Sequence, residues 1–438
     1  MTRPFVQRLF LLVYRAAWYP ALPVVLAYLW LRGRKDPAYR RHLPERFGAG
    51  PGLAGAVWVH AVSLGEMRSA VPLIRALLDR GDTVITSHLT PAGRRAAETA
   101  FAPEIAQGRL VVRYLPLEFG WAMRRFLRRW RPRLCLVMEI EVWPVLIEET
   151  RVAGVPLYLV NSQYTAHSFA RDRRLGAAHP VSGVAGVLAK SDRHAARFRE
   201  LGAPNVSVCG ELRFDQPIPP HLLAAAARLR PLLGGRPVVA IASVVEGEDP
   251  QYLAAYRIIQ EGFRAKGLVP PLFVHIPRAP ERFGTVGDLL AAGGQRVMRR
   301  SVVLDGRLSP RTRLPDADIL LGDSLGEMYF YLALADLAVV GGGFVEKGAH
   351  NIIEPLALRK PVLVGPHVWT IDYPAVEAEA AGVLTICPTI EHLAAEILDL
   401  LLQEAKLQDM SGRTQAFFAE HAGATERVLA ALPPRVVP

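Results

Sequence analysis

From residue 55 onward, continuous apolar runs alternate with segments in which apolar residues recur at helical spacing. In the first half of the chain the apolar runs cover residues 57–62, 83–88, 110–116, 133–139, 155–161 and 184–191. In the second half they cover residues 238–243, 271–277, 317–323, 336–342 and 361–365. Continuous apolar strands separated by helices are typical of a parallel sheet with both faces covered. The pattern therefore predicts an α/β fold with two Rossmann-like domains that face a central cleft.

The alternation is interrupted at residues 215–237, where Pro and Gly stand at both ends of an Ala- and Leu-rich stretch. We place the interdomain linker at residues 216–236. The first Rossmann-like domain then covers residues 46–215, and the second covers residues 237–438. Because ligands of such sheets bind at the carboxyl ends of the strands, we expect the chemistry at the strand-to-helix junctions.

Residues 1–45, which precede the first domain, are interpreted as a membrane-associated segment. Residues 16–31 carry no charge, contain Pro20 and Pro23, and are followed directly by the basic sequence RGRK. These sixteen residues are short for a bilayer span, which needs about 20. The sequence leaves open a tilted or kinked single span and a helical hairpin in the membrane interface, with a soluble core helix as the alternative. Either membrane arrangement places the basic flank against anionic headgroups and the body on the cytoplasmic face of the inner membrane.

Composition adds constraints on compartment and partner. With 51% hydrophobic and 21% charged residues the chain is not disordered, and 438 residues suit two or three domains. The three cysteines are isolated in apolar runs, which indicates buried thiols in a reducing compartment. The net charge of +11 indicates an anionic partner, which is nucleic acid, an anionic membrane surface or an acidic substrate.

A basic segment with aromatic residues lies at 121–133. Trp121, Phe126 and Trp130 stand among arginines that form i,i+4 pairs, a pattern that suits a lipid headgroup surface. A solvated basic face is the alternative, and no recognition motif supports nucleic-acid binding. We therefore expect an anionic membrane surface and no nucleic acid as partner. The lipid-facing candidates are Trp121, Arg124, Arg125, Arg128 and Arg129.

Glu66 lies where an apolar strand gives way to a helix, directly behind Gly65. An acid in the first turn of a helix is favoured by the helix dipole, so this side chain either only stabilises the helix or performs chemistry. The dipole predicts an ionised carboxylate at neutral pH, which suits a general base. Ser63, three residues earlier, is a candidate for the acceptor side of a site.

A second acidic junction is EIEVWP at residues 139–144. Residues two apart on an extended segment face the same side, so Glu139 and Glu141 are both expected to point into the cleft. One of them is a candidate for orienting an acceptor, and an acid that only caps the following helix is the alternative. The Asp-x-Asp spacing of some metal sites is absent and no His group has metal-ligand spacing, so we expect no metal.

The junction richest in functional residue types is GGGFVEKGAHNIIEP at residues 341–355. Its glycines allow a ligand to approach the backbone, and the N–H groups of a helix that starts near Asn351 suit an anion such as phosphate. His350 and Asn351 supply directional donors, and Glu354 is placed to accept from ribose hydroxyls. The alternative is a glycine loop with an Asn cap and a first-turn acid. The candidates for binding a nucleotide are Gly342, Gly343, His350, Asn351 and Glu354.

Arg278 and Arg282 follow another predicted strand, in the sequence HIPRAPERF at residues 275–283. The planar guanidinium group suits phosphate oxygens and base edges. A charged surface turn is the alternative. Both arginines are therefore further candidates for contacts with a nucleotide.

Taken together, these motifs resemble those of the Kdo transferases, membrane-associated glycosyltransferases that move 3-deoxy-D-manno-octulosonic acid (Kdo) from CMP-Kdo onto a lipid A precursor. The resemblance runs from about residue 40 to beyond residue 380. The motifs that carry it are ERFG (45–48), WVHAVSLGE (58–66), EIEVWP (139–144), VCGELRFD (208–215), PRAPERF (277–283), GDSLGEMYFYLALAD (322–336), GGGFVEKGAHNIIEPLAL (341–358) and GPH (365–367). The resemblance implies a GT-B fold, in which an acceptor domain precedes a nucleotide-sugar donor domain, and an N-terminal membrane anchor.

The resemblance also implies roles for individual residues. Glu66, the glutamate of the S-x-G-E motif, is implied to be the general base of an inverting transfer that needs no metal. Arg278 of the P-R-x-P-E-R motif is implied to contact the nucleotide, together with His350, Asn351 and Glu354 of the G-x-H-N-x-x-E-P loop. CMP-Kdo is then the donor substrate, the lipid A precursor is the acceptor, and no cofactor is expected.

The chain departs from the usual family pattern at several positions. Residues 243–248 read SVVEGE where the family usually has S-T-H-x-G-E, and Ala279 stands where it usually has His. Ile140 and Val145 replace the Thr and Asn that are usual in the acidic motif. Two alternatives stay open, and the departures support the first of them. One is a divergent relative that uses another donor or acceptor or binds without catalysis, and the other is a nucleotide-sugar epimerase.

Overall fold

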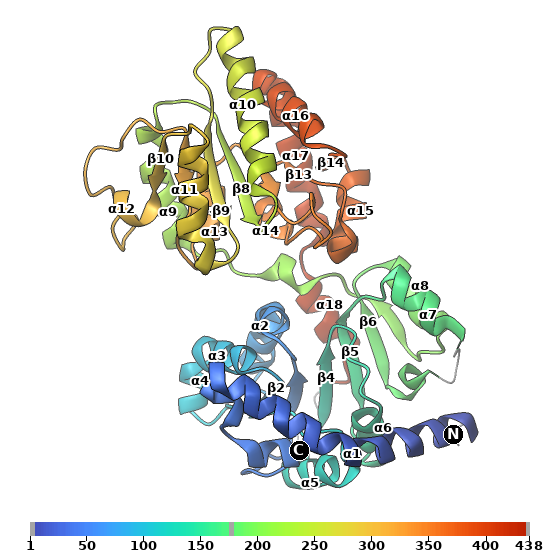
Figure 1. Ribbon diagram of the computed structural model, residues 1–438. Coiled ribbons are helices and arrows are strands. Elements are labelled where there is room, and N and C mark those ends of the chain that lie inside the picture. Colours follow the sequence, from blue (N-terminus) through green and yellow to red (C-terminus); the bar gives the residue numbers. More distant parts are fainter. Residues whose placement is uncertain (1–4, 175–178, 435–438) are drawn as a thin grey trace. The chain divides into compact units, whose positions relative to one another are not determined.

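The computed structural model of the chain describes residues 5–174 and 179–434. Residues 1–4 and 435–438, at the ends of the predicted first and last segments, lie outside these ranges. The chain forms two compact units (Figure 1). Unit 1 comprises residues 1–216 and 423–438, and unit 2 comprises residues 217–422.

The described part of unit 1 contains a sheet of seven parallel strands in the order β3-β2-β1-β4-β5-β6-β7. The strands are β1 (Val57–His60), β2 (Val84–His88), β3 (Leu110–Tyr114), β4 (Leu134–Met138), β5 (Leu157–Ser162), β6 (Gly186–Ala189) and β7 (Val206–Val208). The helices are α1 (Phe5–Lys35), α2 (Leu64–Asp79), α3 (Pro91–Ala100), α4 (Ala102–Ala106), α5 (Gly120–Trp130), α6 (Pro144–Val152), α7 (Ala166–Asp172), α8 (Asp192–Glu200) and α18 (Ala424–Ala431). Short 3-10 turns are η1 (Pro37–Arg40), η2 (Leu43–Phe47), η4 (Pro180–Gly183) and η5 (Leu212–Asp215).

Both faces of this sheet are covered by helices, as the continuous apolar runs predict. Every residue of β1, β2 and β4 is buried. Helices α2, α3 and α18 pack on one face, and α5, α6 and α8 pack on the other. The connections from β1 to α2 and from β4 to α6 leave the sheet at its carboxyl edge, where Glu66 and Glu139 lie.

The described part of unit 2 contains a second sheet of seven parallel strands, in the order β10-β11-β9-β8-β12-β13-β14. The strands are β8 (Val238–Val244), β9 (Leu272–Pro277), β10 (Val297–Arg299), β11 (Ile319–Leu321), β12 (Leu337–Val340), β13 (Val362–Val364) and β14 (Leu384–Ile386). The helices are α9 (Pro220–Leu229), α10 (Asp249–Ala265), α11 (Phe283–Ala292), α12 (Arg300–Val303), α13 (Met328–Leu334), α14 (Ile353–Ala357), α15 (Asp372–Ala380), α16 (Ile390–Leu402) and α17 (Glu404–His421). Short 3-10 turns are η6 (Arg230–Leu233), η7 (Pro280–Arg282) and η8 (Trp369–Ile371). Helices α10, α11 and α16 pack on one face of the sheet, and α9 and α13 pack on the other.

The observed units differ from the predicted domain boundaries in two places. Residues 216–236 contain α9, which buries Leu222 and Ala225 in the core of unit 2 and contacts α13, so this stretch is packed rather than free. The last helix, α18, belongs to unit 1 and not to the second domain. Asp215 holds its start, because its carboxylate accepts the N–H groups of Gly423 at 2.6 Å and Thr425 at 2.5 Å.

Residues 5–35 form one continuous helix, α1, which contains both prolines. One face of α1 packs on unit 1 through residues such as Leu11, Trp18 and Leu29. The opposite face leaves apolar side chains in solvent, with Val24 69% exposed and Leu31 54% exposed. The predicted alternative of a helical hairpin is therefore wrong. A soluble core helix does not fit either, because only 6% of the most apolar stretch of α1 is buried. By length and composition alone, α1 is long and apolar enough to cross a membrane.

Candidate functional site

Glu66 lies in the first turn of α2, at the carboxyl end of β1. Ser63 caps this helix, because its Oγ accepts the Glu66 N–H at 3.4 Å and donates to Glu66 Oε1 at 3.1 Å. Glu66 Oε2 accepts the N–H of Val62 at 2.7 Å. This reciprocal arrangement is a form of the capping box. The side chain thus stabilises the helix start and is held in one position, while each carboxylate oxygen keeps capacity to accept a further proton donor.

The surroundings of Glu66 disfavour its charge. Burial raises the pKa of Glu66 to about 7; the N–H of Val62 opposes this shift, and the carboxylates of Glu141 and Glu139 add to it. The prediction of a fully ionised carboxylate at neutral pH is therefore wrong, since burial outweighs the helix dipole. A pKa near pH 7 is nevertheless the condition under which a general base is most effective.

A buried cluster of charged residues lies at the carboxyl ends of β4, β5 and β6. Lys190 Nζ contacts Glu139 Oε2 at 2.9 Å and Glu211 Oε2 at 2.7 Å. Asn161 Nδ2 donates to Oε1 of the same two glutamates, at 2.8 Å and 2.9 Å. Burial raises the pKa of Glu139, although the charges of Lys190 and Arg213 oppose the shift. The cluster fixes the Glu139 side chain, which is a role that the sequence did not indicate for Lys190, Asn161 or Glu211.

The backbone at this edge shows that residues 139–141 do not form one extended segment. Glu139 and Asn161 both have φ near 57°, in the left-handed region that residues other than glycine seldom adopt. Glu139 therefore begins a turn, so the premise of an extended segment is wrong. Its side chain points into the Lys190 cluster, whereas Glu141 stays partly exposed outside it. Left-handed residues of this kind are often found at functional sites, where the surrounding contacts hold them.

In unit 2, the glycine loop after β12 is packed against other backbone rather than left open. Glu248 accepts the N–H of Gly342 at 2.8 Å and 2.7 Å, and that of Phe344 at 3.1 Å. An added Cβ at Gly343 would lie 2.7 Å from the backbone nitrogen of Gly365. Gly342 and Gly343 thus allow backbone segments to pack closely, and the Gly342 N–H is directed to Glu248. Glu248 belongs to the altered SVVEGE segment, which therefore still supports the loop.

Asn351 lies two residues before a short helix. Its Oδ1 accepts the N–H of Ile353 at 3.1 Å, but the N-cap position is Ile352, whose side chain makes no capping hydrogen bond. The helix that follows, α14, is five residues long and begins at Ile353 rather than near Asn351. So short a helix provides little of the dipole expected to hold an anion. Glu354 lies in its first turn. Burial, and then the charge of Glu354, raises the pKa of Tyr329.

Arg278 and His350 lie side by side with hydrogen-bonding capacity unused. Arg278 Nη1 donates to His350 Nδ1 at 2.9 Å. Burial, and then the charge of Arg278, lowers the pKa of His350 to about 4, so the imidazole is neutral and carries its proton on Nε2. Within residues 5–174 and 179–434, Nε2 has no hydrogen-bond partner and Arg278 has no ion pair. Arg282 is different, because Asp249 and the Val244 carbonyl occupy its guanidinium.

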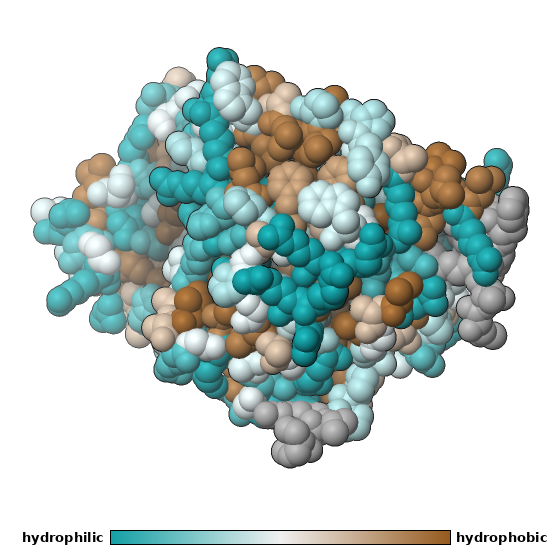
Figure 2. All heavy atoms as spheres, turned by 90° about the horizontal axis from the view of Figure 1, so that it is seen from below, coloured by the Kyte–Doolittle hydropathy of each residue, from teal (hydrophilic) through white to brown (hydrophobic). Residues whose placement is uncertain are grey.

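The exposed face of α5 carries the predicted basic residues. Arg125, Arg128 and Arg129 are exposed, and Trp121 is 41% exposed. Arg124, also exposed, reaches Glu149 Oε1 at 2.8 Å. The same oxygen accepts from Arg15 of α1 at 2.5 Å, so the two helices lie side by side. Figure 2 views the molecule from the side on which α1 and α5 lie in Figure 1, and shows apolar patches among hydrophilic side chains.

The aromatic residues of α5 do not behave as one group. Phe126 and Trp130 are buried, and Phe126 packs on Trp58 with ring centroids 4.7 Å apart. Only Trp121 of the three lies on the exposed basic face. The prediction of aromatic edges to the basic face is therefore wrong for Phe126 and Trp130, which follow the buried stripe of an amphipathic helix.

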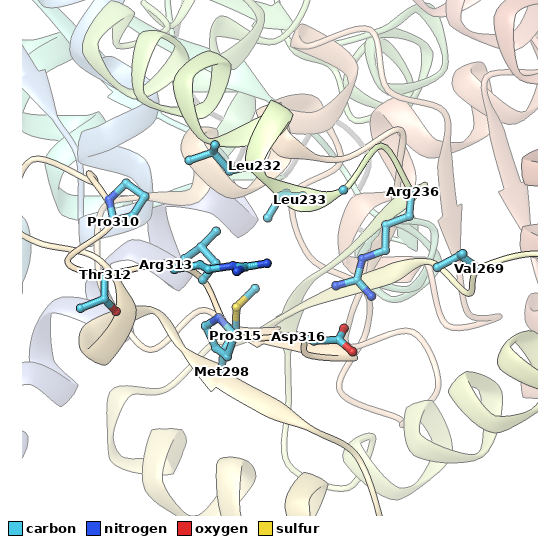
Figure 3. Close-up of a pocket in the computed structure, with 12 residues that line it drawn as sticks. Leu232, Leu233, Arg236, Val269, Met298, Pro310, Thr312, Arg313, Pro315 and Asp316 are labelled. Carbon is cyan, nitrogen blue, oxygen red and sulfur yellow. The ribbon is translucent and has the colours of Figure 1, made fainter.

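A cavity of about 820 Å³ lies at the amino-terminal edge of the sheet in unit 2 (Figure 3). Arg236 precedes β8, and Arg313 precedes β11. Figure 3 shows both guanidinium groups pointing into the cavity. Arg278 and His350 instead follow the carboxyl ends of β9 and β12. The cavity is therefore separate from the candidate nucleotide site.

The burial of the three cysteines agrees with the sequence-based prediction. Cys135, Cys209 and Cys387 are buried and free. In the part of the chain that the structure describes, no group of three or more His, Cys, Asp or Glu side chains is arranged to hold a metal ion.

Comparison with known proteins connects this geometry to one family. The family model described as 3-deoxy-D-manno-octulosonic-acid transferase (kdotransferase) matches residues 41–216. The 3-deoxy-D-manno-octulosonic acid transferase of Bordetella pertussis is 41% identical over 434 residues, covering 96% of this chain and 98% of that protein. The protein of the same name from Haemophilus influenzae is 30% identical over 428 residues, covering 94% and 95%.

A solved structure with the same fold is that of UDP-GlcNAc 2-epimerase from Neisseria meningitidis bound to UDP-GlcNAc. It aligns with a TM-score of 0.56 and covers 86% of this chain and 99% of that chain. The two sequences are 12% identical, so the likeness concerns the fold of paired Rossmann-like units alone.

Proposed function

This chain belongs to the family of 3-deoxy-D-manno-octulosonic acid (Kdo) transferases, which are glycosyltransferases, and on that premise we propose that it transfers Kdo from CMP-Kdo to a lipid A precursor with inversion of the anomeric centre. The observation that carries the proposal is Glu66. Its carboxylate is fixed at the carboxyl end of β1 by Ser63 and Val62, and its pKa near 7 suits proton transfer from an alcohol.

In the proposed reaction, a hydroxyl oxygen of the acceptor sugar attacks the anomeric carbon of Kdo. The new C–O bond forms as the hydroxyl proton passes to Glu66. The bond between the anomeric carbon and the phosphate oxygen breaks, and CMP leaves with the bonding electrons. Attack from the face opposite the phosphate inverts the centre. Glu139 and Glu141 repel the charge of Glu66 and so tune its basicity.

The donor site of this proposal lies in unit 2, at Arg278 and His350. The Arg278 guanidinium, which has no ion pair among the described residues, and the Nε2–H of the neutral His350 imidazole are both donors. Arg278 Nη1 and His350 Nδ1 lie 2.9 Å apart. Such a pair suits the phosphate of CMP, whose negative charge increases as the glycosidic bond breaks. With this positive charge in place the proposal includes no resident metal and no cofactor.

The surface formed by α1 and α5 supports a membrane-bound acceptor. The exposed face of α1 is apolar, and the neighbouring face of α5 carries Arg125, Arg128 and Arg129. An apolar face beside clustered arginines suits the interface of an anionic bilayer. We therefore place α1 at the surface of the inner membrane, with the two units on its cytoplasmic side.

The function is tested with the purified full-length protein, CMP-Kdo and a tetra-acylated lipid A precursor in mixed micelles. We expect the mass of the lipid to increase by one or more Kdo residues while CMP is released. An unchanged lipid with bound CMP-Kdo would instead indicate a relative that binds without catalysis. An altered nucleotide sugar without a lipid product would indicate an epimerase.

A further inference from the structure

A cavity of about 320 Å³ lies between α1 and the sheet of unit 1. It meets the carboxyl ends of the adjacent strands β3, β2, β1 and β4, through the residues that follow each strand. Its volume is near the lower end of the roughly 300–1,000 Å³ that is usual for ligand sites. Most of its lining is apolar, with contributions from Trp18, Val25, Leu29, Leu89, Leu115 and Leu117.

The loop that holds Glu66 forms part of this lining. Val62 lines the cavity, and its N–H donates to Glu66 Oε2 at 2.7 Å. Thr90 also lines the cavity, and its Oγ1 donates to the Val62 carbonyl at 3.3 Å. Trp143 lines it as well and stands two residues after Glu141. A ligand in this cavity therefore ends beside the loop that positions the proposed base.

The cavity also reaches the surface beside α1. Leu29 lines the cavity and is 6% exposed, whereas Leu31, on the other side of the same helix, is 54% exposed. Tyr28 and Arg32 line the cavity and are themselves exposed, so they mark its edge at the surface. An apolar chain can enter there from a bilayer that covers the outer face of α1.

The polar groups of the cavity suit the beginning of an acyl chain. Arg46 lines the cavity and is 2% exposed. Its Nη2 donates to the Leu89 carbonyl at 3.1 Å, but in the described ranges its buried Nε has no hydrogen-bond partner. Glu118 also lines the cavity, and its oxygens accept the N–H groups of Val145 and Leu146 at 2.7 Å and 2.9 Å. Within the described ranges, two lining donors among the apolar side chains are unused, Arg46 Nε and Trp143 Nε1. Such donors match an ester or amide carbonyl that is followed by a hydrocarbon chain.

From these observations we propose that the cavity binds one acyl chain of the lipid acceptor and thereby positions the acceptor sugar at Glu66. This inference rests on the proposed function, because its ligand is the acceptor of that reaction. The cavity is then a binding site that distinguishes an acylated acceptor from the same sugar without its chains.

The first test fills the cavity. In Leu29→Trp the larger side chain occupies the space of about two methylene groups of the ligand. Val152→Trp is the control, because Val152 is 64% exposed at the end of α6. Kdo transfer is measured with the tetra-acylated precursor and with its fully deacylated disaccharide. For Leu29→Trp we expect KM for the acylated acceptor to rise about tenfold, the equivalent of two buried methylene groups. We expect kcat, and the KM for CMP-Kdo, to stay within about twofold of the control.

The two proposals fail in different ways in this assay. If the unmodified protein adds no Kdo to either acceptor, the proposed function is wrong. If the unmodified protein is active and Leu29→Trp matches Val152→Trp on the acylated acceptor, transfer stands and the cavity proposal is overturned. An equal rise in KM for the deacylated disaccharide would also overturn it, because the effect would then not depend on the acyl chain.

A second test uses the unmodified protein, so it does not depend on the folding of a variant. An acceptor with a diazirine in one acyl chain is photolysed on the full chain in vesicles of phosphatidylethanolamine and phosphatidylglycerol, and labelled peptides are identified by mass. We expect label in residues 18–32 and 115–118, and loss of that label when unlabelled acceptor is added. Label confined to other segments would contradict the proposal. Equal loss with added phosphatidylglycerol would assign the cavity to bulk membrane lipid and overturn it.

Discussion

The raised pKa of Glu66 predicts how Kdo transfer depends on pH. A general base must be ionised, so activity is present above its pKa and is lost as the pH falls through it. With the pKa raised from 4.5 to about 7, roughly one-tenth of the carboxylates are ionised at pH 6 and nine-tenths at pH 8. We therefore expect kcat/KM to rise about tenfold between pH 6 and pH 8. An ordinary glutamate with a pKa of 4.5 would give a nearly flat profile over the same range.

The perturbation that tests this cause is Glu141→Gln. Glu141 is a carboxylate whose charge raises the pKa of Glu66, so its neutralisation lowers that pKa and moves the midpoint of the profile to lower pH. Initial rates of Kdo-lipid formation are measured at constant ionic strength, and the midpoint is the readout rather than the maximal rate. Glu200→Gln is the control, since Glu200 is exposed at the end of α8. A flat profile for the unmodified protein, or one midpoint shared by Glu141→Gln and the control, would refute the reasoning.

Three further predictions concern the donor site, the glycine loop and the membrane surface. Arg278→Ala should weaken CMP binding in calorimetry by roughly tenfold to a hundredfold, since a hydrogen bond to a charged group contributes about 1.5–3 kcal/mol. Arg264→Ala is the control, because Arg264 is exposed and its loss should not change the affinity. Equal affinities of the two variants for CMP would contradict the donor site. Gly343→Ala should lower the free energy of unfolding by about 1–3 kcal/mol in urea, because its Cβ would lie 2.7 Å from a backbone nitrogen. Gly284→Ala, which has open space around the added Cβ, should leave the free energy of unfolding unchanged. A larger loss of stability in Gly284→Ala than in Gly343→Ala would be inconsistent with the packing. Leu31→Glu should reduce flotation with anionic vesicles about tenfold or more, and undiminished binding would argue against α1 at the bilayer.

The central strands of both sheets and one edge strand, β3, could be predicted from sequence, but the other three edge strands could not. Every apolar run that was assigned to a strand overlaps one, and the parallel pairing of β1, β2 and β4 agrees with their burial on both faces. The strands that were missed are β7, β10 and β14, each of three residues at an edge of its sheet. An edge strand is partly exposed and has one neighbour, so it needs no continuous apolar run, and β7 has two exposed positions of three.

The candidate site could be predicted where a single junction carries its chemistry. Glu66 and Ser63 lie together after β1, as expected. Arg278 and His350 follow two different strands, β9 and β12, so their contact depends on the sheet and not on one junction. The partners of Glu139 could not be predicted in this way, because Asn161, Lys190 and Glu211 reach it only through the pairing of β4 with β5 and of β5 with β6. The available signal was Lys190, a charged residue that directly ends an apolar run.

The electrostatics of the site were the least predictable part. Helix position alone predicts an ionised Glu66, but burial by residues distant in sequence reverses the sign of its pKa shift. Similarly, the glycines of residues 341–343 indicate close approach to the backbone, but not whether a ligand or Gly365 makes that approach. Both outcomes depend on tertiary packing that a local pattern does not contain.

The measurement that most directly tests the account is the rate of Kdo transfer by Glu66→Ala at saturating CMP-Kdo and lipid acceptor. If Glu66 takes the proton of the attacking hydroxyl, the rate should fall about 10²–10⁴-fold while CMP affinity is unchanged. A rate equal to that of the unmodified protein would show that Glu66 only caps α2, and the mechanism proposed for this site would be wrong.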